Sequence, residues 1–422
     1  MEKIKISSTK DHFIKGEKAF FYLADTIWSA FSHISLEEWE EYLSYRNIQG
    51  FNVLQIIIQP PWDASESDIQ IKPFKTDSKG NYDFFDINDE YFIRAQKMLD
   101  MATEKDFIPA MAILWCNNVA DTWASKKLPH HLMPFKAVKP YVEYIVKAFS
   151  KYNPIYLISG DTDFGSEQTT LYYMTALEVV KSISPDVLTT MHLQPDVYLP
   201  DVFINSKLLD FYMYQSGHRI EEQSLSYKLA QKFYKQSVKR PIVNGEPCYE
   251  GSGYGFKYGR FSAFDVRKAI LQSLLSGAKA GVTYGAHGVW GWHKKGKKFP
   301  GEYFSSTPYD WKTALRLKGA WDAAFIKRIF EKYELYDIEP QDSIMNETEE
   351  IRISVSIDQK KVALYVPYNT DVKVNMDLRR YDWIMINLSD RYISKPDIQI
   401  KKDSSVIGMH NFDSDVLILG MK

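Results

Sequence analysis

Two carboxylic acids follow apolar segments that are typical of buried strands. Asp161 ends the segment IYLISGD, and Glu246 follows PIVNG in PIVNGEPCYEG. A carboxylate at the end of a buried strand is costly unless it is paired or has a chemical function. Two such groups in one site could act as a general acid and as a nucleophile or general base at a glycosidic bond.

The ends of the neighbouring apolar segments carry amides, histidines and aromatic rings. Amides and hydroxyls can bind sugar hydroxyls, and flat rings can stack on the apolar faces of sugars. We expect substrate contacts from Asp25, Trp28, Gln59, Trp62, Trp115, Asn117, His192, Tyr214, Gln215, Asn244, Tyr284, His287 and Trp290.

Several of these polar residues also have a structural interpretation. Asp25 could bond backbone amides or an arginine, and Asp163 could cap the next helix. Glu250 could be a loop residue or could orient Glu246. His192, His218 and His287 could be metal ligands, but no two of them share a local ligand spacing. We therefore expect neither a metal nor another cofactor.

The elements that must position these residues alternate along the chain. Eight expected strands begin at Phe20, Asn52, Ile108, Ile155, Asp186, Leu209, Pro241 and Ala280. Amphipathic segments between them predict helices, for example over residues 36–50, 136–152, 263–279 and 311–333. This order predicts a (β/α)₈ TIM barrel, whose active site lies at the carboxyl ends of the strands. A doubly wound sheet would bring a glycine-rich turn after its first strand, and LADTIWSAF is no such turn.

The pattern changes after residue 336. Segments such as IRISVSID, KVALYVPYN, VKVNMDL, WIMINLS, IQIKKDS and DVLILGM alternate apolar and polar residues. They predict a small all-β sandwich over residues 337–422, after a catalytic barrel with an N-terminal hairpin over 1–336. The sandwich carries a single tryptophan, Trp383, which favours a structural role over sugar binding.

Composition excludes several classes of protein. The net charge is −2, whereas a nucleic-acid-binding protein would usually carry a basic surplus. Cys116 and Cys248 provide neither a disulfide framework nor a metal spacing. The sequence has no apolar run of 18 residues and no signal-peptide pattern, so we expect a cytoplasmic protein without a membrane partner. It does not predict an oligomeric state.

Four motifs resemble the apiosidase-like family of glycoside hydrolases. They are KGEKAFFYLADTIWSAF, ISGDTDF, NGEPCYEG and GVTYGAHGVW. The resemblance covers nearly the whole chain and implies a TIM barrel with a C-terminal β-sandwich. It also implies that Asp161 is the acid/base and that Glu246 is the nucleophile. In the wider superfamily of retaining barrel glycosidases both positions are usually glutamate, so Asp161 fits the narrower family.

The expected function is retaining hydrolysis of a glycosidic bond in a small plant-type oligosaccharide or glycoside. Two alternatives stay open on the sequence alone. One is a non-catalytic carbohydrate-binding barrel protein. The other is a metal-dependent barrel hydrolase that uses Asp25, His192 and His218.

Overall fold

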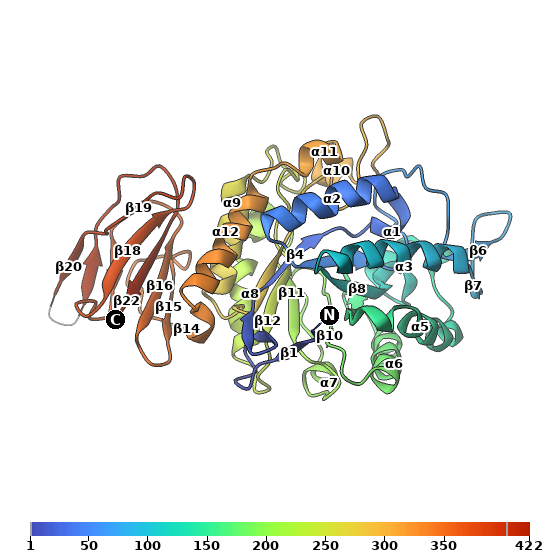
Figure 1. Ribbon diagram of the computed structural model, residues 1–422, viewed down its shortest axis with the longest axis horizontal. Coiled ribbons are helices and arrows are strands. Elements are labelled where there is room, and N and C mark those ends of the chain that lie inside the picture. Colours follow the sequence, from blue (N-terminus) through green and yellow to red (C-terminus); the bar gives the residue numbers. More distant parts are fainter. Residues whose placement is uncertain (1, 402–403) are drawn as a thin grey trace.

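The computed structural model describes residues 2–401 and 404–422. A barrel of parallel strands wrapped by helices lies beside an antiparallel sandwich (Figure 1). The barrel strands follow the order β10-β9-β8-β5-β4-β13-β12-β11. Their bounds are β4 Tyr22–Thr26, β5 Val53–Ile57, β8 Ile108–Trp115, β9 Ile155–Gly160, β10 Thr189–Thr190, β11 Tyr212–Gln215, β12 Ile242–Glu246 and β13 Gly281–Tyr284.

Backbone hydrogen bonds between β10 and the residues just before β11 complete the barrel. The N–H groups of Asp210 and Phe211 donate to the carbonyl oxygen of Thr189 over 3.0 and 3.4 Å. The predicted (β/α)₈ barrel is therefore confirmed. The strands expected over residues 186–193, 209–218 and 280–290 shorten to β10, β11 and β13, because loops carry the flanking residues.

A helix follows each barrel strand. The main helices are α2 Leu36–Gln49, α3 Asp89–Glu104, α5 Phe135–Phe149, α6 Glu167–Ile183, α7 Asp201–Ile204, α8 Leu225–Tyr234, α9 Ala263–Leu274 and α12 Gly319–Lys332. The α2 helix shows why the sequence signals work. Ser35 and Glu38 form a capping box at its start, and Gly50 ends it with a φ of 96°.

The predicted helix over 311–333 is wrong as one element, because the structure has two helices there. The α11 helix covers Trp311–Ala314, and α12 begins at Gly319. Hydrogen bonds from buried polar side chains stabilise the break between the two helices. Arg46 Nη1 donates to the carbonyl oxygen of Leu315 over 3.2 Å, and Glu250 Oε2 accepts the N–H of Gly319 over 2.8 Å. A carboxylate at a helix N-terminus satisfies an N–H group that has no partner within the helix.

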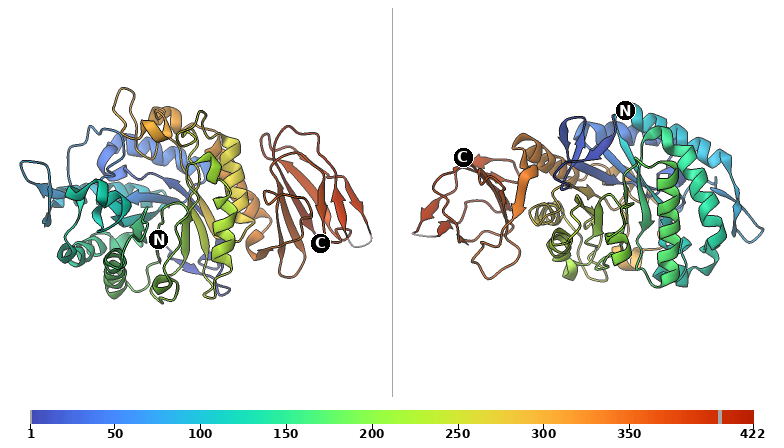
Figure 2. Two further views of the ribbon diagram at one scale, coloured as in Figure 1. Left: turned by 180° about the vertical axis from the view of Figure 1, so that it is seen from behind. Right: turned by 90° about the horizontal axis from the view of Figure 1, so that it is seen from below.

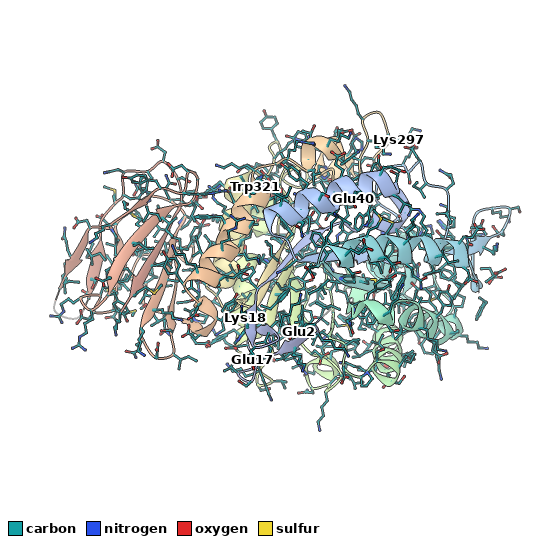
Figure 3. All side chains as sticks on the ribbon, viewed as in Figure 1. Glu2, Glu17, Lys18, Glu40, Lys297 and Trp321 are labelled. Carbon is teal, nitrogen blue, oxygen red and sulfur yellow. The ribbon has the colours of Figure 1, made fainter. Side chains whose placement is uncertain are left out.

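The N-terminal hairpin closes the end of the barrel at which the strands begin. Its strands are β2 Phe13–Lys15 and β3 Lys18–Phe20, and β1 Ile4–Ile6 adds a third strand beside β2. Phe13 packs edge-on against Phe211, just before β11, with ring centres 5.1 Å apart. Figure 3 shows Glu17 and Lys18 of this hairpin at one end of the barrel and Lys297, in the loop after β13, at the other. The substrate side is thus left to the loops that follow the strands.

The loops after the strands contain elements that the sequence did not predict. A two-stranded hairpin, β6 Phe74–Thr76 with β7 Tyr82–Ile87, lies between β5 and α3. The short helices are α1 Ala30–His33, α4 Trp123–Lys127 and α10 Glu302–Ser305.

The C-terminal sheets match the predicted β-sandwich. One sheet has the order β14-β15-β16-β22-β18-β19 and the other β17-β21-β20. Their strands are β14 Ile338–Pro340, β15 Arg352–Ser356, β16 Lys361–Val366, β17 Val372–Val374, β18 Asp382–Asn387, β19 Ile393–Ser394, β20 Ile398–Ile400, β21 Ser405–Ile407 and β22 Val416–Met421. Residues 402–403 of the strand predicted from IQIKKDS lie outside the described residues.

Buried ion pairs connect the sandwich to the barrel. Arg267 Nη1 of α9 lies 2.8 Å from Asp322 Oδ2 of α12, and Arg267 Nη2 lies 2.7 Å from Asp415 Oδ1 beside β22. Ser354 Oγ of β15 donates to the carbonyl oxygen of Leu275 over 2.9 Å. Figure 2 shows from two further sides that the sandwich lies against α9 and α12. It therefore packs on the helical wall, and the boundary at residue 336 stays a prediction.

Within the described ranges, no helix combines the length and apolar character needed to cross a bilayer.

Candidate active site

A cavity of about 360 Å³ opens at the carboxyl ends of the barrel strands. Asp63, Asp161 and Glu246 line it together with histidines and many aromatic rings. These three acids come from the loops or ends of β5, β9 and β12, and β12 lies across the barrel from β5 and β9, which both flank β8. The cavity is therefore where a TIM barrel places its chemistry.

Glu246 is the last residue of β12, and two histidines bind its carboxylate. His218 Nε2 lies 2.8 Å from Oε1, and His192 Nε2 lies 3.2 Å from Oε2. The loop that carries His218 is tied to the same residue, because the N–H of Ser216 donates to the carbonyl oxygen of Glu246 over 3.0 Å. Gly217 makes the turn between them with a φ of 79°.

The histidines decide the charge of Glu246. Burial by itself would raise the pKa of this carboxyl, but the contacts from His192 and His218 outweigh burial and hold the pKa below its usual range. His192 Nδ1 accepts the backbone N–H of Asp161 over 3.2 Å. Its proton therefore lies on Nε2, which faces Glu246. Glu246 is consequently an anion at neutral pH.

Asp161 follows β9 in a strained turn. Its φ is 52°, in the left-handed region that aspartate tolerates better than most residues. The ring of Trp115 lies directly on Gly160, where a Cβ atom would be 1.8 Å from Trp115 Cε3. Trp123 Nε1 donates to the carbonyl oxygen of Asp161 over 2.9 Å. These contacts leave the Asp161 side chain at the cavity wall.

The surroundings of Asp161 favour its protonated form. Burial raises the pKa of this carboxyl well above its usual value, and the charges of Glu246, Asp63 and Asp163 raise it further. Asp161 and Glu246 thus have pKa values shifted in opposite directions. A neutral acid and an anion in one cavity are the pair that acid-assisted nucleophilic chemistry needs.

Asp63 is a third carboxyl of the cavity, and we did not predict it as a site residue. Burial raises its pKa to about 6, the charge of Glu246 adds to this, and a backbone hydrogen bond acts in the opposite direction. It stands in QPPWD, directly after a buried strand. That position was the available signal, and it is the same signal that singled out Asp161.

Six of the predicted contact residues line the cavity. They are Trp28, Trp62, Trp115, Gln215, His287 and Trp290. Trp28 and Trp115 pack with ring centres 5.1 Å apart, and Trp28 Nε1 donates to Tyr249 OH over 2.9 Å. Burial lowers the pKa of His287 to about 3, so this ring is neutral. Its Nδ1 accepts from Trp290 Nε1 over 3.2 Å and fixes that ring in the wall.

Sequence reasoning missed five aromatic rings of the cavity, which are Trp123, Tyr249, Phe299, Tyr303 and Phe304. Trp123 belongs to α4, and its ring centre lies 5.9 Å from that of Trp62. None of the five stands at a strand end, so the rule that found the other rings could not find these.

The remaining predicted contact residues lie outside the cavity wall. They are Asp25, Gln59, Asn117, His192, Tyr214, Asn244 and Tyr284. Among them, His192 reaches the site through Glu246. Asp25 is fully buried, and its Oδ2 accepts from Arg46 Nε over 2.6 Å and from Tyr42 OH over 2.8 Å. Its contacts correspond to the structural alternative, an aspartate bonded to an arginine.

Hydrogen bonds behind the strands occupy others in this group. Tyr214 OH donates to the carbonyl oxygen of Ser226 over 2.7 Å. Asn244 Nδ2 donates to the hydroxyls of Ser216 and Ser273 over 3.0 and 2.9 Å. Tyr284 OH donates to Glu250 Oε2 over 2.6 Å. These side chains position the strand ends and loops rather than face the cavity.

Two further acids near the motifs have structural contacts. Glu250 bonds Tyr284 and the start of α12. Asp163 Oδ1 accepts the N–H of Trp123 over 3.2 Å, so it caps α4, which precedes it in the chain. A cap was expected, but at the next helix. Of the two aspartates in GDTDFG, Asp161 is the one whose carboxyl lies at the cavity. This carboxyl has no hydrogen-bond partner among the described residues.

No three His, Cys, Asp or Glu side chains within residues 2–401 and 404–422 are grouped so that they could hold a metal ion. In particular, Asp25 lies on Arg46 and does not join His192 and His218.

Comparison with known families decides the class of this site. The model of the family described as "Apiosidase-like, catalytic domain" matches residues 7–337. The chain belongs to this family. It is a glycoside hydrolase, and its substrate is a carbohydrate. No curated protein matches the chain.

Solved structures with the same fold support the architecture. One, titled "Glycoside hydrolase", has 18% identity and a TM-score of 0.82, with 100% of this chain and 97% of that chain covered. A glycoside hydrolase family 5 protein from Bacteroides vulgatus has 18% identity and a TM-score of 0.82, with 100% and 93% covered. A putative glycoside hydrolase from the same organism has 16% identity and a TM-score of 0.69, with 100% and 82% covered. At these identities the likeness concerns the fold.

Proposed function

We propose that this apiosidase-like protein is a retaining glycoside hydrolase in which Asp161 is the acid/base and Glu246 is the nucleophile. The observation that carries the proposal is the opposite shift of the two pKa values within one cavity. Residues of β9 and β12 hold the pair, and these are the fourth and seventh barrel strands.

The first step forms a glycosyl ester. The Asp161 carboxyl gives its proton to the glycosidic oxygen while the Glu246 carboxylate attacks the anomeric carbon. The bond between that carbon and the oxygen breaks, and the leaving group departs as an alcohol. His218 and His192 keep Glu246 anionic and aim its two oxygens.

The second step regenerates the enzyme. The Asp161 carboxylate takes a proton from water as the water oxygen attacks the anomeric carbon. The ester bond to Glu246 breaks, and the carboxylate returns to its two histidines. The charge of Asp63 raises the affinity of Asp161 for a proton, which favours the next cycle.

The rings around the pair support a sugar as the reacting group. Trp28, Trp115 and Trp290 offer flat apolar faces, while Gln215 offers an amide for hydroxyls. We propose a small plant-type oligosaccharide or glycoside as the substrate. A panel of aryl apiosides, arabinosides and rhamnosides would identify the sugar that is released.

The decisive experiment follows the anomer of the first-formed product by NMR, with the best substrate of that panel. Net retention is expected, and initial formation of the inverted anomer would refute the nucleophile. Glu246→Gln should lose at least about 10³-fold in kcat. Asp161→Asn should lose more on glycosides with poor leaving groups than on activated ones. Asp196→Asn, at the exposed rim of the same cavity, is the matched control and should retain activity.

A further inference from the structure

Exposed aromatic rings stand beside the mouth of the cavity. Phe256 is 65% exposed and Tyr303 is 72% exposed, with their ring centres 6.0 Å apart. The ring centre of Phe304 lies 5.1 Å from that of Phe256. Tyr303 and Phe304 themselves line the cavity. We call Phe256, Tyr303 and Phe304 the rim platform.

The backbone of Phe256 is as unusual as its exposure. Its φ is 62°, a left-handed conformation that a bulky aromatic residue rarely adopts. Strain of this kind persists where the surrounding structure imposes it, and it clusters at ligand-binding sites. Burial does not explain the residue, because most of its ring faces solvent. The strained backbone and the exposed apolar ring are both unfavourable in free energy. Both are consistent with selection for a contact that forms only when a ligand is bound.

Neighbouring loops hold the platform in place. The N–H of Gly253 donates to the carbonyl oxygen of Ser305 over 2.7 Å, and that of Ile220 donates to Tyr254 over 3.3 Å. Gly255 packs so closely that a Cβ atom would lie 2.9 Å from Arg219 Cγ and 3.1 Å from Phe304 Cε2. The loops after β11, β12 and β13 therefore form one unit that continues the cavity wall outward.

Arg219 gives the platform a polar edge. Its guanidinium lies 5.9 Å from the ring centre of Phe256, and its Nη1 is 3.2 Å from Glu222 Oε1. Arg219 and Glu222 both line the cavity. Flat rings with an adjacent charged donor and acceptor suit a pyranose or furanose ring, which has apolar faces and a hydroxyl edge.

We propose that the rim platform binds a second sugar unit, adjacent to the sugar whose bond is broken. This rests on the proposed function and narrows its substrate to a saccharide chain of at least two sugar units. A glycoside with a small non-sugar leaving group would leave the platform empty. Stacking at Phe256 and Tyr303 would contribute binding free energy and leave the bond-breaking groups untouched.

The test compares two substrates that share the reacting sugar. The glycosyl fluoride of the sugar released in the aryl-glycoside panel reaches only Asp161 and Glu246. A trisaccharide that contains the same sugar also reaches the platform. Phe256→Ala and Tyr303→Ala should each lower kcat/KM on the trisaccharide by roughly 5- to 10-fold, mainly through KM. On the fluoride, kcat/KM should stay within about 2-fold of wild type.

Matched variants separate stacking from loss of folding. Phe256→Tyr, unlike Phe256→Ala, should turn over the trisaccharide as the wild type does, because tyrosine keeps an aromatic ring at this position. Tyr392→Ala removes a ring that is 61% exposed on the sandwich, and it should change neither substrate. Melting temperatures of all variants should match that of the wild type.

Four results would count against the platform. An equal loss on both substrates, or no loss on either, would overturn it while leaving the reaction intact. A wild-type dimer that Phe256→Ala dissociates, with no dependence on substrate length, would identify the patch as a contact between chains instead. Failure of the wild-type protein to turn over any fluoride would refute the proposed function itself, and the platform with it.

Discussion

His218 Nε2 lies 2.8 Å from Oε1 of Glu246, and the loop that carries His218 is hydrogen-bonded to the backbone of the same glutamate. The β11 register shifts between Tyr214 and Gln215, so that Gln215 pairs with Glu246. The end of β11 and the end of β12 are therefore one rigid unit. The position and the charge of the proposed nucleophile depend on a residue 28 positions earlier in the chain.

Removal of this histidine should change the acidic limb of the pH profile. His218 helps to hold the pKa of Glu246 below its usual range, so His218→Ala should raise that pKa. Because the nucleophile must be ionised, the acidic limb of kcat/KM should move to higher pH. Loss of a hydrogen bond to a charged group should also cost roughly 10- to 100-fold in kcat/KM at neutral pH. His12→Ala, at the opposite end of the barrel, should leave the profile unchanged.

Asp63→Asn should instead shift the alkaline limb of the pH profile of kcat/KM. The pKa of Asp63 is about 6, so its carboxylate is charged above that pH and raises the pKa of Asp161. Without this charge Asp161 should lose its proton at lower pH. The alkaline limb of kcat/KM should therefore move to lower pH, while the acidic limb stays within its error. An unchanged alkaline limb would mean that Asp161 is not the acid, or that Asp63 does not act on it.

The buried pair of Asp25 and Arg46 should matter for stability rather than for substrate binding. Neither side chain is exposed, and Arg46 Nε lies 2.6 Å from Asp25 Oδ2. Arg46→Met would leave an unpaired buried acid and should lower the free energy of unfolding by about 3–5 kcal/mol in urea titrations. The double variant with Asp25→Asn should lose less. The KM of either folded variant should match that of the wild type. A changed KM would indicate that Asp25 contributes to substrate binding.

Arg267 should couple the unfolding of the two domains. Its guanidinium bridges Asp322 on the barrel and Asp415 on the sandwich, and all three side chains are buried. Arg267→Met should leave Asp415 as an unpaired buried acid and Asp322 with only Arg391, 3.8 Å away, and it should cost about 3–5 kcal/mol. Calorimetry should then resolve separate transitions where the wild type shows one. Arg379→Met removes an exposed ion pair within the sandwich and should cost at most about 1 kcal/mol.

Element type was predictable where local signals agree. NVLQIIIQ became β5, which is buried throughout, because a parallel strand covered on both faces contains little besides apolar residues. The break between α11 and α12 was not predictable. It depends on Arg46 and Glu250, which are distant in the chain and reach its backbone only in the folded barrel.

The site was partly predictable for the same reason. Asp25, Asp63 and Asp161 all stand at or just after strand ends, and no local feature separates them. The structure places Asp25 beneath α2 against Arg46, and the other two at the cavity. Side chains at a strand end can face the helices or the cavity, and that choice depends on the packing of neighbouring strands and loops.

The sequence by itself determined the barrel, the sandwich and the family. Periodic apolar segments, helix caps and strand-end motifs are local signals, and their order along the chain can be recognised without the folded structure. Only the tertiary structure decided which carboxyls share a cavity, which of them keeps its proton, and where exposed rings extend the cavity. Those properties arise from charges, burial and contacts between residues that lie far apart in the chain, such as Asp161 with Glu246 and Phe256 with Tyr303.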